Sequence, residues 1–183
     1  LRIDLLVGDG DSLGPAGLER FVRAGVEVER SPVDKDETDT ELALLAALRR
    51  GADRLTLLGA LGGRRLDHEL ANLWLLGHPA LGRVSAAILD ATARVRLLQA
   101  PNADGHPARL DLPGRVGALV SLLPFSGDAV GITTEGLRYP LRDELLRLGP
   151  ARGISNVRLT PTASVTLRAG RLLVSEEPGT LSP

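Results

Sequence analysis

The chain has 183 residues, enough for one sizeable hydrophobic core or two small ones, and its formal net charge is −1. The sequence offers no basic field for nucleic acid and no apolar run near the roughly 20 residues of a membrane helix, so we expect neither partner. Cysteine is absent, which excludes disulfides and thiolate metal sites and is compatible with a location in the reducing cytoplasm.

The first half of the sequence alternates between strand and helix patterns. Strand patterns lie at residues 3–7, 26–28, 55–58 and 86–89, and helical patterns lie between them at about 15–24, 42–48 and 67–76. Thr38 and Glu41 stand in the relation of a capping box at the start of the second helix. Asp67 suits the N-cap of the third helix, and Trp74, among leucines on that helix, is expected in the core. This alternation predicts a mostly parallel sheet covered by helices.

The pattern changes near residue 92. Short β-type runs separated by turn residues follow it at 95–98, 109–112, 118–123, 129–133, 163–167 and 171–174. Only residues 142–148 suggest a helical turn in this half. We therefore expect an α/β domain over residues 1–92 and a small all-β domain over residues 93–183.

Two charged loops follow the first two predicted strands. They read Gly8-Asp9-Gly10-Asp11-Ser12 and Asp34-Lys35-Asp36-Glu37-Thr38-Asp39-Thr40-Glu41. The paired carboxylates of Asp9 and Asp11 can share a hard cation such as Mg²⁺. Lys35 is a natural phosphate partner, and the free N–H groups at a helix start beside Thr38 and Asp39 can also bind phosphate. Each loop alone also fits a plain turn or a solvated acidic segment before a helix.

A third loop joins the next strand to a helix. It reads Gly59-Ala60-Leu61-Gly62-Gly63-Arg64-Arg65-Leu66-Asp67-His68, and its glycines, arginines and acid could cradle a polyphosphate. A helix start with surface arginines is the simpler explanation of this loop alone. In an open α/β sheet, however, ligands bind outside the carboxyl ends of the strands, where all three loops would meet. This coincidence favours metal-assisted phosphoryl chemistry on the residues Asp9, Asp11, Asp36, Asp39 and Asp67.

In order and spacing, these loops and Asn72 resemble the motifs of the thiamine pyrophosphokinase family. The C-terminal half resembles the thiamine-binding domain of that family in three segments, Ser121-Leu122-Leu123-Pro124, residues 131–141 and Gly153-Ile154-Ser155-Asn156. The resemblance implies a mostly parallel, Rossmann-like α/β catalytic domain without its first strand and helix, followed by a β-sandwich domain. It also implies a cytoplasmic homodimer that binds thiamine near the subunit interface.

The resemblance further implies a reaction and roles for single residues. The family moves the pyrophosphoryl group of ATP onto the hydroxyl of thiamine, giving thiamine diphosphate and AMP, with Mg²⁺ as cofactor. By position, the metal-associated acids would be Asp9, Asp11 and Asp39. The residues beside the ATP phosphates would be Asp34, Lys35, Asp36 and Thr38, and those facing the reacting groups Arg65 and Asp67, with Asp11 and Asp39 also essential for catalysis. Ser155 and Asn156 match the segment that meets thiamine.

The sequence departs from the family pattern at its start. Family members carry a preceding strand and an Asp-Gly-Gly segment in the nucleotide site, and the sequence shows neither, so we expect a truncated chain. Two alternatives stay open. A Mg²⁺-dependent phosphotransferase or phosphohydrolase acting on another small molecule would turn over ATP or a phosphate ester without thiamine. A non-catalytic thiamine- or nucleotide-binding module would bind thiamine but form no AMP.

Overall fold

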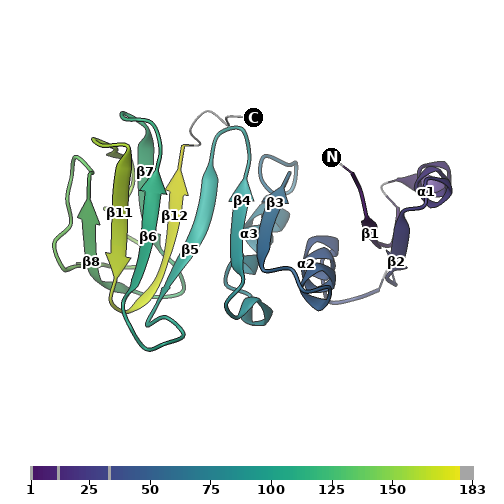
Figure 1. Ribbon diagram of the computed structural model, residues 1–183, viewed down its shortest axis with the longest axis horizontal. Helices are drawn as coiled ribbons and strands as arrows, with labels where there is room; N and C mark the ends of the chain where they lie inside the picture. The colour runs from purple at the N-terminus through teal and green to yellow at the C-terminus, as the bar shows by residue number, and fades with distance from the viewer. Residues whose placement is uncertain (1, 12, 33, 178–183) are drawn as a thin grey trace. The chain divides into compact units, whose positions relative to one another are not determined.

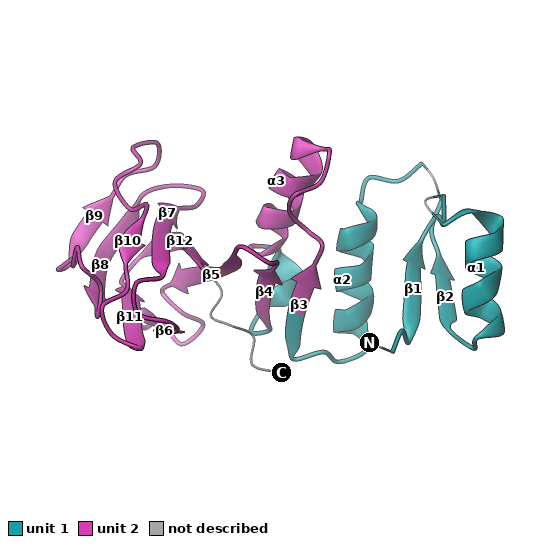
Figure 2. Cartoon of the chain, turned by 90° about the horizontal axis from the view of Figure 1, so that it is seen from above, with its two compact units in different colours: residues 1–55, 78–84 teal, residues 56–77, 85–183 magenta. Residues whose placement is uncertain are grey.

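The computed structural model describes residues 2–11, 13–32 and 34–177 (Figure 1). The chain divides into two compact units, one formed by residues 1–55 with 78–84 and the other by residues 56–77 with 85–183 (Figure 2). None of the described helices is both long and apolar enough to cross a membrane.

The first unit is built around a β–α–β arrangement. Its elements are β1 (Leu5–Gly8), α1 (Gly14–Arg23), β2 (Glu27–Arg30), α2 (Asp39–Arg49) and the 3-10 helix η1 (Pro79–Leu81). Strands β1 and β2 pair in parallel, with Gly8 opposite Arg30 at their carboxyl ends. Pro15 stands in the first turn of α1, where a missing N–H costs no helical hydrogen bond. Because the strands are parallel, the two charged loops leave the same end of this sheet.

Helix α2 packs against β1 and begins where the sequence predicts. The Oγ1 atom of Thr38 accepts a hydrogen bond from the backbone N–H of Glu41 at 3.1 Å, which confirms Thr38 as the N-cap. Leu44 and Ala46 of this helix are buried. The start of α2 is therefore fixed both by its cap and by packing of its apolar face.

The second unit carries one further helix and most of the strands. Its elements are β3 (Arg54–Leu58, whose first two residues belong to the first unit), α3 (Leu66–Leu75), β4 (Ser85–Leu89), β5 (Arg94–Ala100), β6 (Ala108–Pro113), β7 (Leu119–Pro124), β8 (Ala129–Glu135), β9 (Glu144–Leu146), β10 (Asn156–Val157), β11 (Thr162–Leu167) and β12 (Gly170–Glu176). They form a six-stranded sheet in the order β10-β7-β12-β5-β4-β3 and a four-stranded sheet in the order β6-β11-β8-β9.

The main hydrophobic core of the second unit draws on both of these sheets. In β12, Leu172, Val174 and Glu176 are buried while the residues between them are partly exposed, as expected for a strand with one face in the core. The larger core residues contributed by the strands are Leu98, Leu112, Val120, Leu122, Ile132, Leu146, Val165, Leu167, Leu172 and Val174. A second cluster, which includes Leu76 and Ile88, lies in the part of the unit that contains α3 and β4.

Three expectations for local structure are wrong. Helix α3 begins at Leu66 with Arg65 as its N-cap and no side-chain cap, so Asp67 lies inside the first turn. Trp74 is 62% exposed, because α3 buries Asn72 and Leu75 instead. The segment expected as a helical turn contains strand β9, which pairs with β8.

The sheet arrangement differs from a single parallel sheet in the first half. Parallel pairing joins β1 to β2, whereas β4 pairs antiparallel with β5 within the six-stranded sheet. This β4–β5 pairing crosses the domain boundary expected between residues 92 and 93. The overall fold is thus mixed α/β with several sheets, and the expected boundary stays a prediction.

Candidate functional site

The carboxyl end of β1 lies beside the start of α2 in the first unit. Gly8 has φ +140°, and a Cβ placed on it would lie 3.0 Å from the carboxylate carbon of Asp39. Any other residue at this position would have a strained backbone and would press on the Asp39 carboxylate, so glycine permits the close approach. The backbone N–H of Ser31 donates to the Gly8 carbonyl at 3.2 Å, which joins the two loops again. The structure therefore brings the first two predicted loops to one place.

Asp9 and Asp11 form a compact turn after β1. The Asp9 Oδ1 atom accepts a hydrogen bond from the Asp11 backbone N–H at 3.0 Å. This bond holds the pKa of Asp9 below its ordinary value of 3.8, and the nearby charge of Lys35 lowers that pKa as well. Asp9 is therefore an ionised carboxylate at neutral pH. Ser12, the last residue of the quoted motif, lies outside the described residues.

Lys35 is the cation of this loop cluster. Its side chain is only 12% exposed, and its ammonium group lies 2.5 Å from Asp39 Oδ1 and 2.8 Å from Ser31 Oγ. Asp39 is also the first residue of α2, where the positive end of the helix dipole favours a carboxylate. The ion pair and the helix start together hold Asp39 in place. Asp34 and Asp36 are exposed on the same loop.

The three acids expected to hold a metal do not form a preassembled cage. Among the described residues, no group of three Asp, Glu or His side chains is arranged to bind a metal ion. One oxygen of Asp39 is already paired with Lys35, and one oxygen of Asp9 accepts the backbone hydrogen bond described above. These carboxylates still offer the hard oxygen donors that Mg²⁺ prefers when it keeps waters and phosphate in its shell.

The third charged loop belongs to the second compact unit. Arg65 Nη2 lies 2.5 Å from Asp67 Oδ2 and Arg65 Nε lies 3.2 Å from Asp67 Oδ1, so the guanidinium contacts both carboxylate oxygens. The guanidinium lowers the pKa of Asp67, and the carboxylate raises the pKa of Arg65. Asn72 is buried and donates to the Ala60 carbonyl at 2.9 Å, which ties α3 to the Gly-rich loop. The expected meeting of all three loops at one edge stays a prediction.

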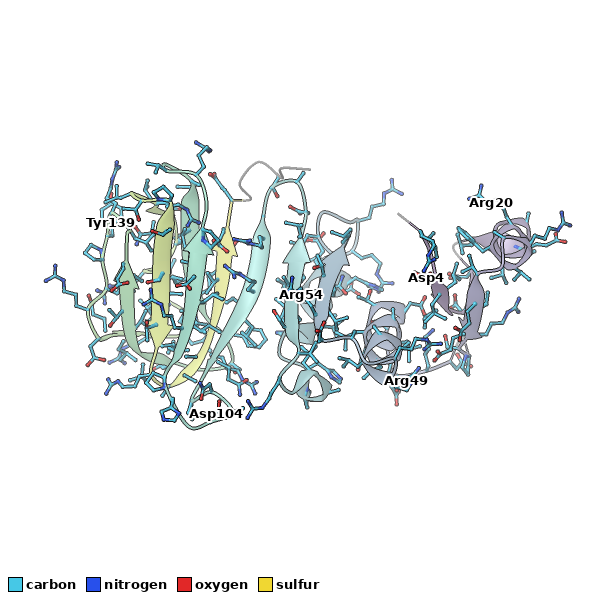
Figure 3. All side chains as sticks on the ribbon, viewed as in Figure 1. Asp4, Arg20, Arg49, Arg54, Asp104 and Tyr139 are labelled. Atoms are coloured by element: carbon cyan, nitrogen blue, oxygen red, sulfur yellow. The ribbon has the colours of Figure 1, made fainter. Side chains whose placement is uncertain are left out.

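A cavity of about 150 Å³ opens in the second unit beside the predicted thiamine segment. Its lining residues are Leu122, Tyr139, Pro140, Leu141, Arg152, Gly153, Ile154 and Asn156. Tyr139 is 62% exposed, and it lies at the surface of the β-rich part of the chain (Figure 3). The cavity therefore combines apolar walls with an accessible aromatic ring and an arginine.

Asn156 contributes to this cavity mainly by holding its wall. Its Oδ1 atom accepts from the Tyr139 backbone N–H at 3.0 Å and from the Val157 N–H at 2.9 Å, and its Nδ2 atom donates to the Tyr139 carbonyl at 2.7 Å. Asn156 is 6% exposed. Ser155 is exposed, has φ 56°, and its backbone N–H donates to Ser121 Oγ at 3.1 Å. Both ends of the Asn156 amide are thus already used by the backbone.

Sequence reasoning missed Tyr139 and Arg152 as cavity residues. Tyr139 is the only tyrosine of the chain and stands inside one of the quoted C-terminal segments, which was the available signal. Arg152 lies just before another such segment and pairs with Glu144 of β9. Residue spacing does not predict that Arg152 lies at the cavity. It also does not predict the pairing of Arg152 with Glu144, because the segment containing Glu144 was expected to be a helical turn.

Comparisons with known proteins find one family along the chain. Residues 1–86 match the family model described as thiamin pyrophosphokinase, catalytic domain, and residues 108–172 match the one described as thiamin pyrophosphokinase, vitamin B1 binding domain. The chain is 27% identical over 168 residues to a thiamine pyrophosphokinase of Bacillus subtilis, covering 91% of this chain and 75% of that protein. It is 28% identical to thiamine pyrophosphokinase 1 of Oryza sativa, covering 89% of this chain and 62% of that protein.

Solved structures agree with these matches. A thiamine pyrophosphokinase structure from Bacillus subtilis has a TM-score of 0.81 and 26% identity, covering 95% of this chain and 78% of that one. A thiamin pyrophosphokinase family protein from Enterococcus faecalis has a TM-score of 0.80 and 27% identity, covering 98% and 82%. The chain spans less than two thirds of the plant relatives, 62% of the rice protein and 58% of an Arabidopsis thaliana one. With both family domains matched in order and the fold shared over nearly the whole chain, this protein belongs to the thiamine pyrophosphokinase family.

Proposed function

We propose that the chain is a thiamine pyrophosphokinase, which transfers the pyrophosphoryl group of ATP to the hydroxyl of thiamine and releases AMP. The observation that carries the proposal is that a catalytic-domain match and a vitamin B1 binding-domain match follow each other in this one chain. The charged loops of the first unit suit the phosphates of ATP, and the cavity of the second unit suits a small ring compound.

The proposal includes the architecture expected from the family. Residues 1–92 would form a Rossmann-like nucleotide domain, supported by the parallel β1–α1–β2 unit, and residues 93–183 a β-sandwich, supported by the core shared between two sheets. The enzyme would work in the cytoplasm as a homodimer. These finer statements follow the family resemblance.

For the nucleotide, Lys35 is the natural partner of a phosphate oxygen. Its nearly buried stem holds the ammonium group beside Asp39, and an incoming phosphate would replace this carboxylate as its partner. Thr38 fixes the start of α2, whose first N–H groups carry the positive end of the helix dipole. Asp34 and Asp36 complete the loop and would lie beside the same phosphates. Each of these groups positions the nucleotide for attack.

A magnesium ion that accompanies ATP fits the acids of the first unit. Mg²⁺ commonly binds through one or two carboxylates together with substrate phosphates, so a closed protein cage is not required. Asp9, Asp11 and Asp39 would hold it, and the cation would neutralise charge that develops on the phosphates. When Lys35 turns from Asp39 to a phosphate, the Asp39 carboxylate would become available to the metal ion.

For the acceptor, Asp67 would orient the thiamine hydroxyl. Because Arg65 lowers the pKa of Asp67, this carboxylate is a weak base at neutral pH but a good hydrogen-bond acceptor. Arg65 would stabilise negative charge on the transferred group. In the cavity, the ring of Tyr139 would pack against thiamine, with Ser155 at the rim and Asn156 holding the Tyr139 backbone. Asn156 would thus act by positioning another residue.

One incubation tests the proposal. The protein is mixed with ATP, Mg²⁺ and thiamine, and AMP and thiamine diphosphate are measured together. We expect equal amounts of the two products, and no AMP when thiamine is omitted. Release of phosphate or ADP without thiamine would instead support a phosphohydrolase or another phosphotransferase. Thiamine binding in the complete mixture without AMP would identify a non-catalytic binding module.

A further inference from the structure

A second cavity, of about 230 Å³, opens in the second unit at the end of β5 and the start of β12. Its lining comes from these two neighbouring strands and from the loop between β7 and β8 (Figure 1). The lining includes Gln99, Phe125, Ser126, Asp128, Gly170 and Arg171. None of its residues lines the cavity with Tyr139 or belongs to the charged loops, so this is a separate place on the molecule.

Arg171 is the cation of this second cavity. It is partly buried, and within residues 2–11, 13–32 and 34–177 its side chain makes no hydrogen bond or ion pair. The other described arginines without such a partner are all exposed. A guanidinium is always charged and carries five N–H donors in a planar fork that matches a carboxylate. Arg171 therefore presents unused donors at a cavity that a ligand can enter.

Gln99 and Ser126 add polar groups beside Arg171. Gln99 on β5 stands directly opposite Arg171 in the antiparallel pairing with β12, so the two side chains share one face of the sheet with Cβ atoms about 5 Å apart. Among the described residues, neither the Gln99 amide nor the Ser126 hydroxyl has a hydrogen-bond partner. Three polar side chains without a partner in the protein thus line one cavity, which is the pattern of a ligand site.

Close packing holds the other walls of the second cavity. A Cβ placed on Gly77 would lie 3.0 Å from the Phe125 ring, so the ring rests on the glycine that follows α3. A Cβ on Gly170 would lie 2.6 Å from the Asp128 carbonyl oxygen, so glycine lets the β7–β8 loop lie directly on the start of β12. The backbone N–H of Phe125 also donates to the Arg171 carbonyl at 2.9 Å. The fold therefore fixes an aromatic ring beside the polar groups.

The charges and the size of the second cavity restrict its ligand. Asp128 is the acid of the lining, and its Oδ1 atom accepts from the Leu148 N–H at 2.9 Å. Between the described side chains of Asp128 and Arg171 no ion pair forms. The negative charge of Asp128 disfavours a phosphate dianion and leaves one cation for a single carboxylate. The volume lies below the roughly 300–1,000 Å³ of sites for drug-sized ligands, which favours a small molecule over a nucleotide.

We propose that this second cavity binds a small monocarboxylate with a flat apolar body. The Arg171 guanidinium pairs with the carboxylate, the Gln99 amide and the Ser126 hydroxyl donate to its oxygens, and the apolar body lies against Phe125. The ligand joins β5, β12 and the β7–β8 loop, so its binding stabilises this end of the six-stranded sheet. The site does not depend on the proposed function, because it shares no residue with the charged loops or the cavity with Tyr139.

Benzoate and its neutral amide, benzamide, are matched probes because they differ mainly in charge. Calorimetric titration of the full chain at constant ionic strength should give a Kd of about 1–10 mM for benzoate. Benzamide and inorganic phosphate should bind about 10-fold more weakly or less. Equal binding of benzoate and benzamide would contradict the role of Arg171, and binding of phosphate alone would exclude a carboxylate site. Absence of benzoate binding would overturn the proposal.

Two variants and a control locate the bound benzoate. Arg171→Gln should weaken benzoate binding by about 10-fold or more, whereas Arg152→Gln, which removes the arginine of the other cavity, should leave it unchanged. Gln99→Glu places a carboxylate opposite Arg171, so benzoate binding should be lost while the midpoint of thermal unfolding does not fall. This variant keeps Arg171 and so does not require the fold to tolerate its loss. Unchanged binding in Arg171→Gln, or lost binding in Arg152→Gln, would place benzoate elsewhere and refute the proposal.

Discussion

The two candidate regions of this molecule are built on different principles. The loop cluster of the first unit consists of largely exposed acids around Lys35, whose mostly buried side chain forms an ion pair with Asp39. The cavity of the second unit depends on a buried amide, Asn156, whose polar atoms are all used by backbone groups. To bind phosphate, a charged side chain such as Lys35 must be able to exchange its protein partner for the ligand. To bind a ring, the cavity needs a wall that keeps its shape. The difference suggests variants that affect one region and leave the other intact.

The largest effect should follow from Asp39→Asn. Its carboxylate is proposed to bind the nucleotide-associated cation, so we expect the rate of AMP formation to fall by about 100-fold or more. The matched control is Glu37→Gln, which removes an exposed acid from the same segment and should retain activity. Circular dichroism should show both variants folded. A fully active, Mg²⁺-dependent Asp39→Asn protein would rule out this role.

Lys35→Met should have the next largest effect. Loss of one charge-assisted hydrogen bond to phosphate should lower kcat/KM for ATP by about 10- to 100-fold, with KM for thiamine unchanged. Steady-state kinetics in both substrates measures this difference. Lys35→Arg keeps the charge and should recover part of the loss. Equal effects on both substrates would mean that Lys35 serves the fold of the whole site.

Asn156→Ala tests the opposite region. It leaves the partly buried N–H and C=O of Tyr139 without their Asn156 partners, which should lower the free energy of unfolding by about 1–3 kcal/mol. Because the Tyr139 wall would loosen, KM for thiamine should rise by about 10-fold while KM for ATP stays constant. Tyr139→Leu should raise KM for thiamine with a smaller loss of stability. If Asn156→Ala changed only stability, a role in positioning the ring would be excluded.

The smallest effect concerns the exposed pair of Arg65 and Asp67. Because Arg65 lowers the pKa of Asp67, the pair stabilises the fold above the ordinary value of 3.8, and this contribution is lost as pH falls through the lower folded-state pKa. Solvent screening keeps it small. NMR titration of the Asp67 carboxyl should show a midpoint below 3.8 that moves up in Arg65→Gln and not in Arg64→Gln. An unchanged midpoint in Arg65→Gln would mean that another group lowers this pKa.

Local sequence signals predict the fold where one interaction dominates. Thr38 caps α2 as expected because the cap bond forms within four residues of the chain. The β12 pattern is readable because alternate residues face the core. Trp74 was misplaced because leucines surround it on all sides of α3, so hydrophobicity alone does not tell which face is buried. The segment containing β9 was misassigned because its pairing with β8 is a tertiary contact.

The candidate site shows the same division. The charged loops could be recognised from residue types and from the strand pattern. Parallel strands β1 and β2 end at the same edge of their sheet, and this brings Gly8 close to Asp39. The ion pair of Lys35 with Asp39 and the amide contacts of Asn156 could not, because both depend on side-chain orientation. The cavity wall formed by Tyr139 and Arg152 likewise requires the three-dimensional arrangement of segments far apart in sequence.

The pairing of β4 with β5 has a consequence for anyone who expresses part of this protein. A fragment starting at residue 93 would keep β5 but lose its partner β4, and residues 94–96, which now face 87–89, would become an unprotected edge. Unpaired strand edges pair with strands of other molecules, so this fragment should self-associate. A fragment that starts before β3 keeps the β4–β5 pairing and should remain monodisperse at the same concentration. The change in sequence pattern near residue 92 is therefore a poor place to divide the chain into fragments.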